Sequence, residues 1–359
     1  MEQQIIPPSH ITETVELTWG LERIVGGCRA CGQAYLISKS WIGQICPHCI
    51  NGRLEEQPAV VRQEPPELLI LFQLNKARLQ NIYTQFTRGL WLAPDDFNPN
   101  HLLQRAMPVF WPMWLVDSDV KGVWQAEMGF DYQVKSSVEA YQAGQWNTQQ
   151  RIETRIRWET RIGTLERHYD NIAVPALEEH AKMSSLLGDY ALEQAKTYQI
   201  EDLGNALIWL PDLSPENSWE IAQKAIQQAA GNECQKAAEA QHARNFSIQA
   251  EYSNQRWSQM LLPMIVSYYH GDDGKVYPVW INGQNGQIRG IRAASQRKGW
   301  IWAGVSSGIA LALFIAGLLL TAIPPITVLG AILIVLAFCI GVFAIIPAVW
   351  PWQWNRKQR

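Results

Sequence analysis

Two stretches of the chain alternate apolar and polar residues with a period of two, which is typical of β-strands with two different faces. In residues 120–135, small or apolar side chains occupy the even positions, and most odd positions carry charged or polar ones. In residues 151–162, isoleucine, tryptophan and threonine share one face, and the other face holds four arginines and two glutamates. Both stretches are predicted to be strands.

Other segments predict helices and further strands. Residues 67–97 indicate a strand that enters a helix ending near Gly89. Helices are also predicted over about 175–198 and from Ser214 to about Ala240, where Ser-Pro-Glu opens the first turn. In residues 246–295, Gly-Asp-Asp-Gly and Asn-Gly-Gln-Asn-Gly turns separate β-rich runs and predict a three-stranded meander. The predicted fold class is α+β.

Two long apolar runs lie near the carboxyl end of the chain. Residues 303–323 and 326–346 each form 21 positions without a charge, with Pro324-Pro325 between them. At about 1.5 Å per residue, each helix would span about 30 Å, which is the thickness of a bilayer core. We expect two transmembrane helices that pack as an antiparallel hairpin, so the lipid bilayer is the first expected partner.

Charges and indoles beside these runs indicate an orientation. Basic residues precede the first run and follow the second, whereas the turn between them carries no charge. The positive-inside rule therefore predicts an integral membrane protein with cytoplasmic amino and carboxyl ends. The indoles of Trp300, Trp302, Trp350, Trp352 and Trp354 fall at the expected headgroup level. The first 19 residues show no cleavable signal, so we expect the preceding body to stay in the cytosol.

The first apolar run also contains a Gly-x-x-x-Gly pair, Gly304 and Gly308. Such a pair allows a neighbouring helix to approach closely. A protein partner, or a second copy of the chain that associates through the membrane hairpin, is therefore expected.

Four of the six cysteines form two Cys-x-x-Cys pairs near the amino end. Two such knuckles facing each other make a tetrahedral all-sulfur site suited to Zn(II). Gly32 follows the first pair and Pro47 lies inside the second, and both favour the tight turns that the site needs. We predict one structural zinc ion in a zinc ribbon, held by Cys28, Cys31, Cys46 and Cys49.

A dithiol redox pair is the alternative for these cysteines, but neither pair begins a helix in a βαβ context. His48 lies between two ligands, and because four thiolates already fill a tetrahedron, we expect it to be a surface residue. Cys234 and Cys339 stand alone and are expected to be apolar packing residues.

The predicted domains follow from these segments. A stretch rich in proline, glutamate and glutamine separates the ribbon from the rest and is interpreted as a linker. The expected order is a ribbon over 1–54, a linker over 55–66, an α+β cytosolic body over 67–298, and a transmembrane hairpin with a basic tail over 299–359.

The charge pattern makes nucleic acid an unlikely partner. The formal net charge is −3, and between Cys28 and Cys49 only Arg29 and Lys39 are cationic. Two phosphate contacts give little binding at physiological salt. The four arginines of residues 151–162 offer phosphate contacts, but the two interleaved glutamates can pair with arginines across the sheet, which is the interpretation we favour.

Several motifs together resemble a known family. They are the four-cysteine ribbon, the Trp/Pro motif at Trp111, Pro112 and Trp114, the Gly-Lys-x-Tyr turn at 274–277 and the Asn-Gly-x-x-Gly turn at 282–286. With them, the chain resembles bacterial membrane-anchored zinc-ribbon proteins of the TFIIB type, some of which carry names borrowed from a primosomal helicase. The resemblance implies the ribbon and the anchor but no established activity. A helicase would need a Gly-x-x-x-x-Gly-Lys-Ser/Thr loop, which this sequence lacks.

Enzyme motifs are absent from the sequence as well. It has no His-Glu-x-x-His and no Gly-x-Gly-x-x-Gly, and it offers no candidate catalytic or cofactor-binding residue beyond the metal ligands. The local cluster Glu178-Glu179-His180 is expected to lie on the surface, because consecutive helical residues point in different directions. We therefore expect a non-enzymatic structural or protein-interaction adaptor. A membrane-associated nucleic-acid-binding factor is the first alternative, and a membrane-bound enzyme with a non-local site is the second.

Overall fold

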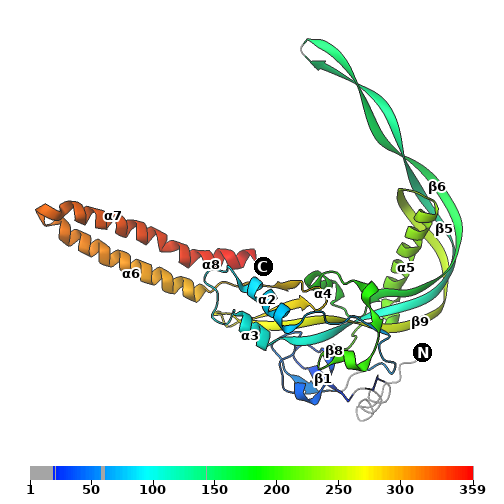
Figure 1. The fold of residues 1–359 in the computed structure, drawn as a ribbon, viewed down its shortest axis with the longest axis horizontal. Helices are drawn as coiled ribbons and strands as arrows, with labels where there is room; N and C mark the ends of the chain where they lie inside the picture. The colour runs from blue at the N-terminus through cyan, green and yellow to red at the C-terminus, as the bar shows by residue number, and fades with distance from the viewer. Residues whose placement is uncertain (1–18, 21, 58–60, 143, 359) are drawn as a thin grey trace. The chain divides into compact units, whose positions relative to one another are not determined.

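The structure is a computed structural model that describes residues 19–20, 22–57, 61–142 and 144–358. The predicted absence of an amino-terminal signal falls almost entirely on residues 1–18, outside these ranges. The described strands form one sheet in the order β11-β10-β9-β5-β8-β2-β1-β3, with β6 paired to β5 and the short β4 paired to β7 and β9 (Figure 1). With several helices beside this sheet, the predicted α+β class is confirmed.

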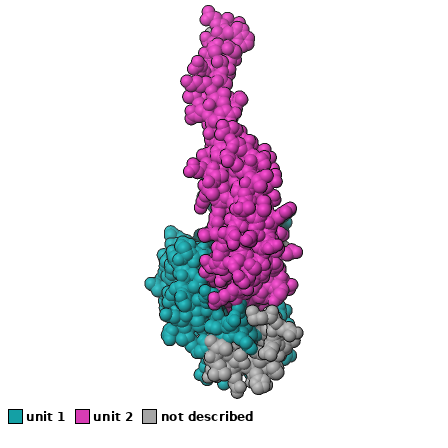
Figure 2. Space-filling view, turned by 90° about the vertical axis from the view of Figure 1, so that its right-hand side faces the viewer, with its two compact units in different colours: residues 1–111, 179–210, 261–359 teal, residues 112–178, 211–260 magenta. Residues whose placement is uncertain are grey.

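The described chain divides into two compact units, each built from separate segments. Unit 1 comprises residues 1–111, 179–210 and 261–359, and unit 2 comprises residues 112–178 and 211–260 (Figure 2). Two strands, β5 (Met107–Gln142) and β9 (His242–His270), run through both units.

The amino-terminal part of unit 1 is a small antiparallel sheet. β1 (Ile24–Cys28) pairs with β2 (Ala34–Ile37) on one side and with β3 (Leu54–Glu56) on the other. β2 also pairs with β8 (Leu207–Trp209), and β8 runs parallel to the start of β5. The cysteine-bearing segment is therefore continuous with the central sheet of unit 1.

This continuity differs from the expected separate ribbon and linker. Residues 54–56, at the start of the expected linker, are strand β3. Val61 lies in a buried cluster with Leu36 of the ribbon and Phe110 of the body. The proline-rich composition gave no sign of this packing, because the apolar residues that anchor the segment are spaced irregularly.

The predicted strand–helix segment and meander are both present. β4 (Leu68–Leu69) precedes α2 (Lys76–Thr87), whose Asn75 caps it by accepting from the Arg78 backbone N–H, and Gly89 follows with φ +77°. The short α3 (Pro99–Gln104) comes next. β9, β10 (Val276–Asn282) and β11 (Ile288–Gly290) form the antiparallel meander and pack their apolar side chains against α2.

The helix predicted over residues 175–198 is much shorter in the structure. α4 spans only His180–Leu187, and Gly188, at φ +70°, ends it by donating its N–H to the Ser184 carbonyl. After it come the 3₁₀ turn η2 (Leu192–Gln194), strand β7 (Lys196–Thr197) and the 3₁₀ turn η3 (Ile200–Leu203). β7 pairs with β4, so a tertiary strand contact overrides the helical pattern.

Unit 2 consists of a long β-hairpin, one helix against it and the first part of β9. β5 and β6 (Gln145–Pro175) pair from Met113–Pro175 to Gln142–Gln145, with one irregularity near Ser118. α5 (Pro215–Ala237) begins as predicted, because the Ser214 hydroxyl accepts from the Asn217 backbone N–H. Its buried face, which includes Ala222, Ile226 and Ala230, packs on the β5–β6 ribbon.

The charged face of β6 is organised differently from our expectation. Its ion pairs join neighbours along the strand: Arg155 with Glu153 at 3.6 Å, and Arg157 and Arg161 with Glu159 at 3.1 and 2.7 Å. The favoured mutual pairing of arginines with glutamates is present, but it does not run across the sheet, because the β5 residues that face Glu153 and Glu159 are Val134 and Met128. Arg157 and Arg161 lie over the ring of Phe130 instead.

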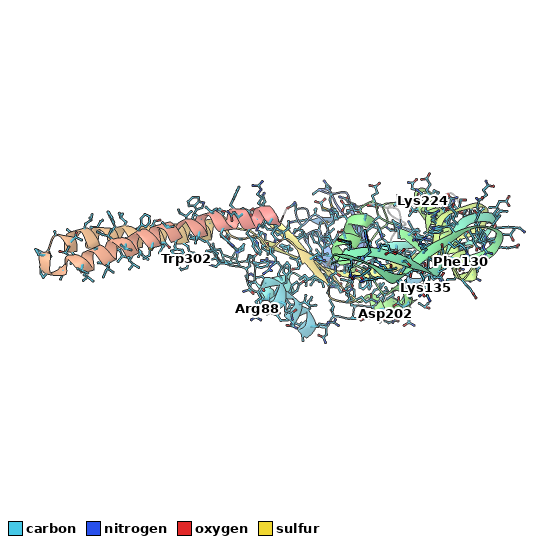
Figure 3. The ribbon with its side chains drawn as sticks, turned by 90° about the horizontal axis from the view of Figure 1, so that it is seen from above. Arg88, Phe130, Lys135, Asp202, Lys224 and Trp302 are labelled. Atoms are coloured by element: carbon cyan, nitrogen blue, oxygen red, sulfur yellow. The ribbon has the colours of Figure 1, made fainter. Side chains whose placement is uncertain are left out.

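Two apolar helical stretches form a hairpin at the carboxyl end of unit 1, and both are long and apolar enough to cross a membrane. α6 spans Gln296–Thr321, and after the 3₁₀ turn η4 (Pro324–Ile326), α7 (Thr327–Phe343) and α8 (Ile345–Lys357) return beside it. Only 11% and 17% of the two apolar windows are buried, unlike a helix in a soluble core. Side chains such as Trp302 project outward from the hairpin (Figure 3).

Small residues hold the two arms of the hairpin together. A Cβ added at Gly317 of α6 would lie 2.9 Å from the Gly330 carbonyl oxygen of α7. Gly304 and Gly308 have no atom within 4 Å of an added Cβ, so this glycine pair does not take part in the α6–α7 contact.

Candidate metal centre

The first cysteine pair lies on the turn between β1 and β2. Cys28 is the last residue of β1, and its carbonyl accepts from the Gly32 N–H at 2.8 Å and from the Cys31 N–H at 3.4 Å. Gly32 has φ +76°, where glycine carries no steric cost. The glycine after the pair therefore makes the tight turn that the sequence predicted.

The second pair forms a similar turn with a different residue after it. The Cys46 carbonyl accepts from the Ile50 N–H at 3.0 Å, and Ile50 occupies the left-handed region at φ 59°. A β-branched residue is strained there, and its side chain is only 4% exposed. The buried isoleucine packing compensates for a conformation that glycine provides in the first knuckle.

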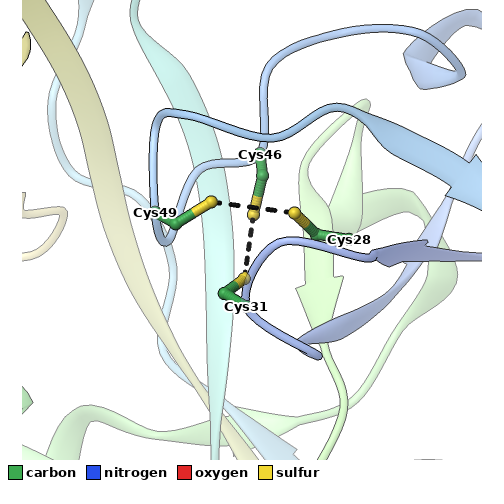
Figure 4. Close-up of side chains that lie close together, drawn as sticks. All are labelled: Cys28, Cys31, Cys46 and Cys49. Carbon is green, nitrogen blue, oxygen red and sulfur yellow. Dashed lines mark hydrogen bonds between the residues drawn. The ribbon is translucent and has the colours of Figure 1, made fainter.

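The two knuckles bring the four sulfurs into one cluster (Figure 4). All four Sγ atoms lie within 4.8 Å of one another, with Cys28 and Cys49 at 3.7 Å and Cys31 and Cys46 at 3.7 Å. In a tetrahedral site with Zn–S bonds of about 2.3 Å, the sulfurs would be about 3.8 Å apart. The four cysteines predicted as ligands could hold one metal ion.

Hydrogen bonds prepare these sulfurs for a cation. The Gly52 backbone N–H donates to Cys49 Sγ at 3.3 Å. A hydrogen bond between Cys31 Sγ and Cys46 Sγ lowers the pKa of Cys46, whereas burial raises the pKa of Cys28. Thiolates are the form in which cysteines bind a metal.

Buried aromatic side chains close one side of the cluster. Tyr35 of β2 is fully buried, and its pKa is raised well above the usual range by burial and then by the neighbouring Cys46 and Cys31 sulfurs. Its ring lies 5.8 Å from that of Trp209 on β8, whose indole N–H donates to the Gln33 side chain at 2.8 Å. The pairing of β2 with β8 thus places buried aromatic side chains beside the sulfurs.

His48 is not the surface residue that we expected. Its side chain is 16% exposed, its ring lies 5.3 Å from that of Trp209, and its Nε2 is 3.0 Å from a Glu179 carboxylate oxygen. Glu179 also accepts from Lys182. The expectation failed because the partner of His48 lies 131 residues along the chain, on the segment that enters α4.

Two members of the Glu178-Glu179-His180 cluster are therefore partly buried. His180 lies against the Trp111 ring at 5.2 Å, and burial lowers its pKa. Glu178, which belongs to unit 2, is exposed. No alternation or spacing in the sequence could have linked Glu179 and Trp209 to the cysteine-bearing segment, since only the fold brings them to His48.

The residues that carried the family resemblance stabilise the fold. The Trp111 indole N–H donates to the Tyr190 hydroxyl, which donates to the Pro263 carbonyl at 2.9 Å. The Asn282 side-chain oxygen accepts from the Gln284 and Asn285 N–H groups, and its amide donates to the Leu187 and Asp189 carbonyls. The Asn-Gly-x-x-Gly turn thus fixes the segment after α4.

An open polar cleft lies beside this turn. It has a volume of about 580 Å³, and its lining includes the side chains of Gln73, Arg78, Gln194 and Gln284. The Gln194 side-chain oxygen accepts from both Gln73 and Gln284. Amides that already bond to one another leave few groups for a ligand, so the sulfur cluster is the stronger candidate.

Comparisons with known proteins add no relative. No family model, no curated protein and no solved structure matches the chain. The family resemblance stays a prediction from the motifs, and the geometry of the site alone supports a functional proposal.

Proposed function

We propose that this protein is a membrane-anchored adaptor whose four-cysteine site holds one structural zinc ion and whose body, facing the cytosol, binds another protein. The observation that carries the proposal is the closed set of four sulfurs built into the sheet of unit 1. A metal that keeps all four positions for protein ligands supports folding and has no open position for substrate.

Zinc is the metal that the donor set favours. Four thiolates in a tetrahedral arrangement suit Zn(II), and a reducing cytosol would keep the cysteines available as ligands. Buried Tyr35 and Trp209 exclude water from one side of the cluster, which supports a stable structural site.

The anchor and its orientation rest on the apolar hairpin and its flanking charges. Arg289, Arg292 and Arg297 precede or begin α6, and Arg356 and Lys357 end α8. Transfer of each such cation through a bilayer costs about 2.5 to 3.5 kcal/mol on the translocon scale. These charges favour a cytosolic body with the η4 turn on the opposite side.

Metal content is the first test. Purified full-length protein should contain one zinc per chain by elemental analysis, and Cys31→Ser should lose it while Cys234→Ser keeps it. Absence of zinc from protein purified without chelators would count against the structural role of the site.

Orientation needs a separate test in intact cells. An impermeant maleimide should label a single cysteine placed at Pro325 from outside the cytoplasm, and it should not label one placed at Lys357. The reverse pattern would remove the cytosolic location that the adaptor proposal requires.

The adaptor role itself requires a partner that depends on the metal site. From membranes dissolved in mild detergent, the full-length chain should recover a protein in stoichiometric amount, and Cys31→Ser should lose this protein although its hairpin still anchors it. Equal recovery by both forms would show that the ribbon is not the binding module.

A further inference from the structure

Strand β6 has an edge without a partner strand over most of its length. Among the described strands, the 31-residue β6 pairs with β5 only. Residues 145–152 and 154–157 of β6 are exposed. A long free edge is a template for pairing with another strand, and beyond the part of β5 that pairs with β9, β5 and β6 form a two-stranded ribbon, which is only marginally stable (Figure 1).

The register shows which backbone groups point to the free edge. Gln142 and Gln145 form the last pair of the ladder with two residues between them in the sequence, and such a closing pair is hydrogen-bonded. Hydrogen-bonded and non-hydrogen-bonded pairs alternate in an antiparallel ladder, and the register runs unbroken past Gly163. Odd-numbered residues of β6 therefore bond to β5, and even-numbered residues direct their N–H and C=O groups outward.

The side chains at this edge are self-complementary. Residues 151–156 and 157–162 read Arg-Ile-Glu-Thr-Arg-Ile and Arg-Trp-Glu-Thr-Arg-Ile, a hexapeptide that repeats with one change. We propose that two copies of the chain form a homodimer by antiparallel pairing of their β6 edges about a twofold axis through Arg157. The facing pairs would then be Ile152–Ile162, Glu153–Arg161, Thr154–Thr160, Arg155–Glu159 and Ile156–Trp158, each occurring twice.

Charge selects this register over its neighbour. An axis one residue earlier, at Ile156, would place Arg151 opposite Arg161, Glu153 opposite Glu159 and Arg155 opposite Arg157, which like-charge repulsion disfavours. With the axis at Arg157, both glutamates face arginines, and only the two Arg157 side chains are alike. The existing pairs along β6 are exposed and weak, so these side chains can turn to the partner strand.

The apolar face supports the same arrangement. Ile152 is 61% exposed and Ile162 is 68% exposed, on the face of the ribbon that α5 does not cover. In the dimer each would face the other across the new strand pair. The even-numbered residues that offer outward backbone groups are β-branched except for the aromatic Trp158, and both kinds of side chain favour strands.

A charge exchange tests the pairing directly. The double variant Glu153→Arg/Glu159→Arg sets arginine opposite arginine at all four mixed pairs, and Arg155→Glu/Arg161→Glu sets glutamate opposite glutamate. Each full-length variant alone, in detergent, should be monomeric by light scattering coupled to size-exclusion chromatography, whereas the wild type is dimeric. Mixing the two variants should restore a dimer that contains one chain of each, because all four mixed pairs are then of opposite charge and only the two Arg157 side chains stay alike.

Cross-linking tests the position of the axis. Cysteines introduced by Arg157→Cys would face each other on the axis, and a short bismaleimide should link the two chains of an Arg157→Cys dimer. Cysteines introduced by Arg151→Cys would be roughly 40 Å apart, at about 3.4 Å per residue, and should give no linked dimer.

A monomeric wild type would overturn the proposal. So would variants that both stay dimeric alone, since the chains would then associate through another surface such as the α6–α7 hairpin. Failure of the mixture to associate would also overturn the proposal, whereas its association would show that repulsion at the edge, and not misfolding, made each variant monomeric. Equal cross-linking at positions 151 and 157 would exclude the proposed register.

Discussion

Leu36→Ala should weaken the metal site and the core of unit 1 together. Leu36 lies on β2, is fully buried, pairs with Ile208 of β8 and packs in one cluster with Phe110 and Leu261. Truncation of a fully buried leucine costs about 2 to 5 kcal/mol, because apolar contact is lost and a cavity remains. At about 3 kcal/mol, the ratio of folded to unfolded protein falls roughly a hundredfold.

The assay is urea unfolding of the full-length chain in mild detergent, followed by two signals. A chromogenic chelator reports metal release, and tryptophan fluorescence reports the surroundings of residues such as Trp209. Both midpoints should shift to lower urea by the same amount in Leu36→Ala. The control Ile42→Ala lies on the same cysteine-bearing segment, but Ile42 is 39% exposed, so its midpoints should barely move.

Metal release at the wild-type urea midpoint in Leu36→Ala, with a shifted fluorescence midpoint, would refute the expected coupling of the metal site to the core of unit 1. That result would make the cysteine-bearing segment an independent domain, as its composition first indicated. A shift of equal size in Ile42→Ala would show instead that the ribbon is sensitive to any truncation.

Three more outcomes are expected. Cys46→Ser should abolish metal binding and lower the thermal stability of unit 1, as measured by protease resistance of the full chain, and unchanged resistance would mean that the metal does not support the fold. Gly317→Leu should lower the melting temperature in detergent, because an added Cβ lies 2.8 Å from the Ile334 side chain, whereas Gly304→Leu has open space and should not, so equal effects would argue against the α6–α7 contact. Partial burial alone would raise the pKa of Asp96, but hydrogen bonds from Arg105 and His270 overcome it and hold that pKa well below its usual range. A depressed carboxyl pKa stabilises the fold above the unfolded value of about 3.9, and this stabilisation is lost as the pH falls further. By denaturant titration at pH 6, Asp96→Asn should therefore have a lower free energy of unfolding than the wild type, and this difference should become smaller below about pH 4. A difference of the same size at pH 3 and pH 6 would contradict the electrostatic cause.

Local patterns in the sequence predicted most elements, because each depends on residues that are close along the chain. The alternation in residues 120–135 and 151–162 identified β5 and β6, the Ser214 cap began α5, and the cysteine spacing identified four residues that the structure brings together. The two apolar runs likewise identified helices that could cross a membrane.

Contacts between distant segments were beyond such patterns. The pairing of Tyr35 with Trp209 joins strands that are 174 residues apart, and it is set by the packing of the whole core. The same holds for His48, whose polar partner Glu179 belongs to a segment that we expected on the surface. The predicted helix over 175–198 failed for the related reason that β7 gains a strand partner in β4, which no local window contains.

Unit 1 is built from segments that are far apart in the chain, so the ribosome makes the cysteine knuckles long before the strand that supports them. The cysteine knuckles leave the ribosome early, but β8, which supports them through Tyr35 and Leu36, follows about 170 residues later. At about 5 to 20 residues per second, roughly 10 to 35 seconds pass between these events. During that interval the four thiols are present without β8 and its buried Trp209, and the apolar helices α6 and α7 have not yet been made. A metal captured in this period would hold the knuckles together while the rest of unit 1 is translated, so the cell's supply of that metal during translation would affect how much chain reaches its folded state.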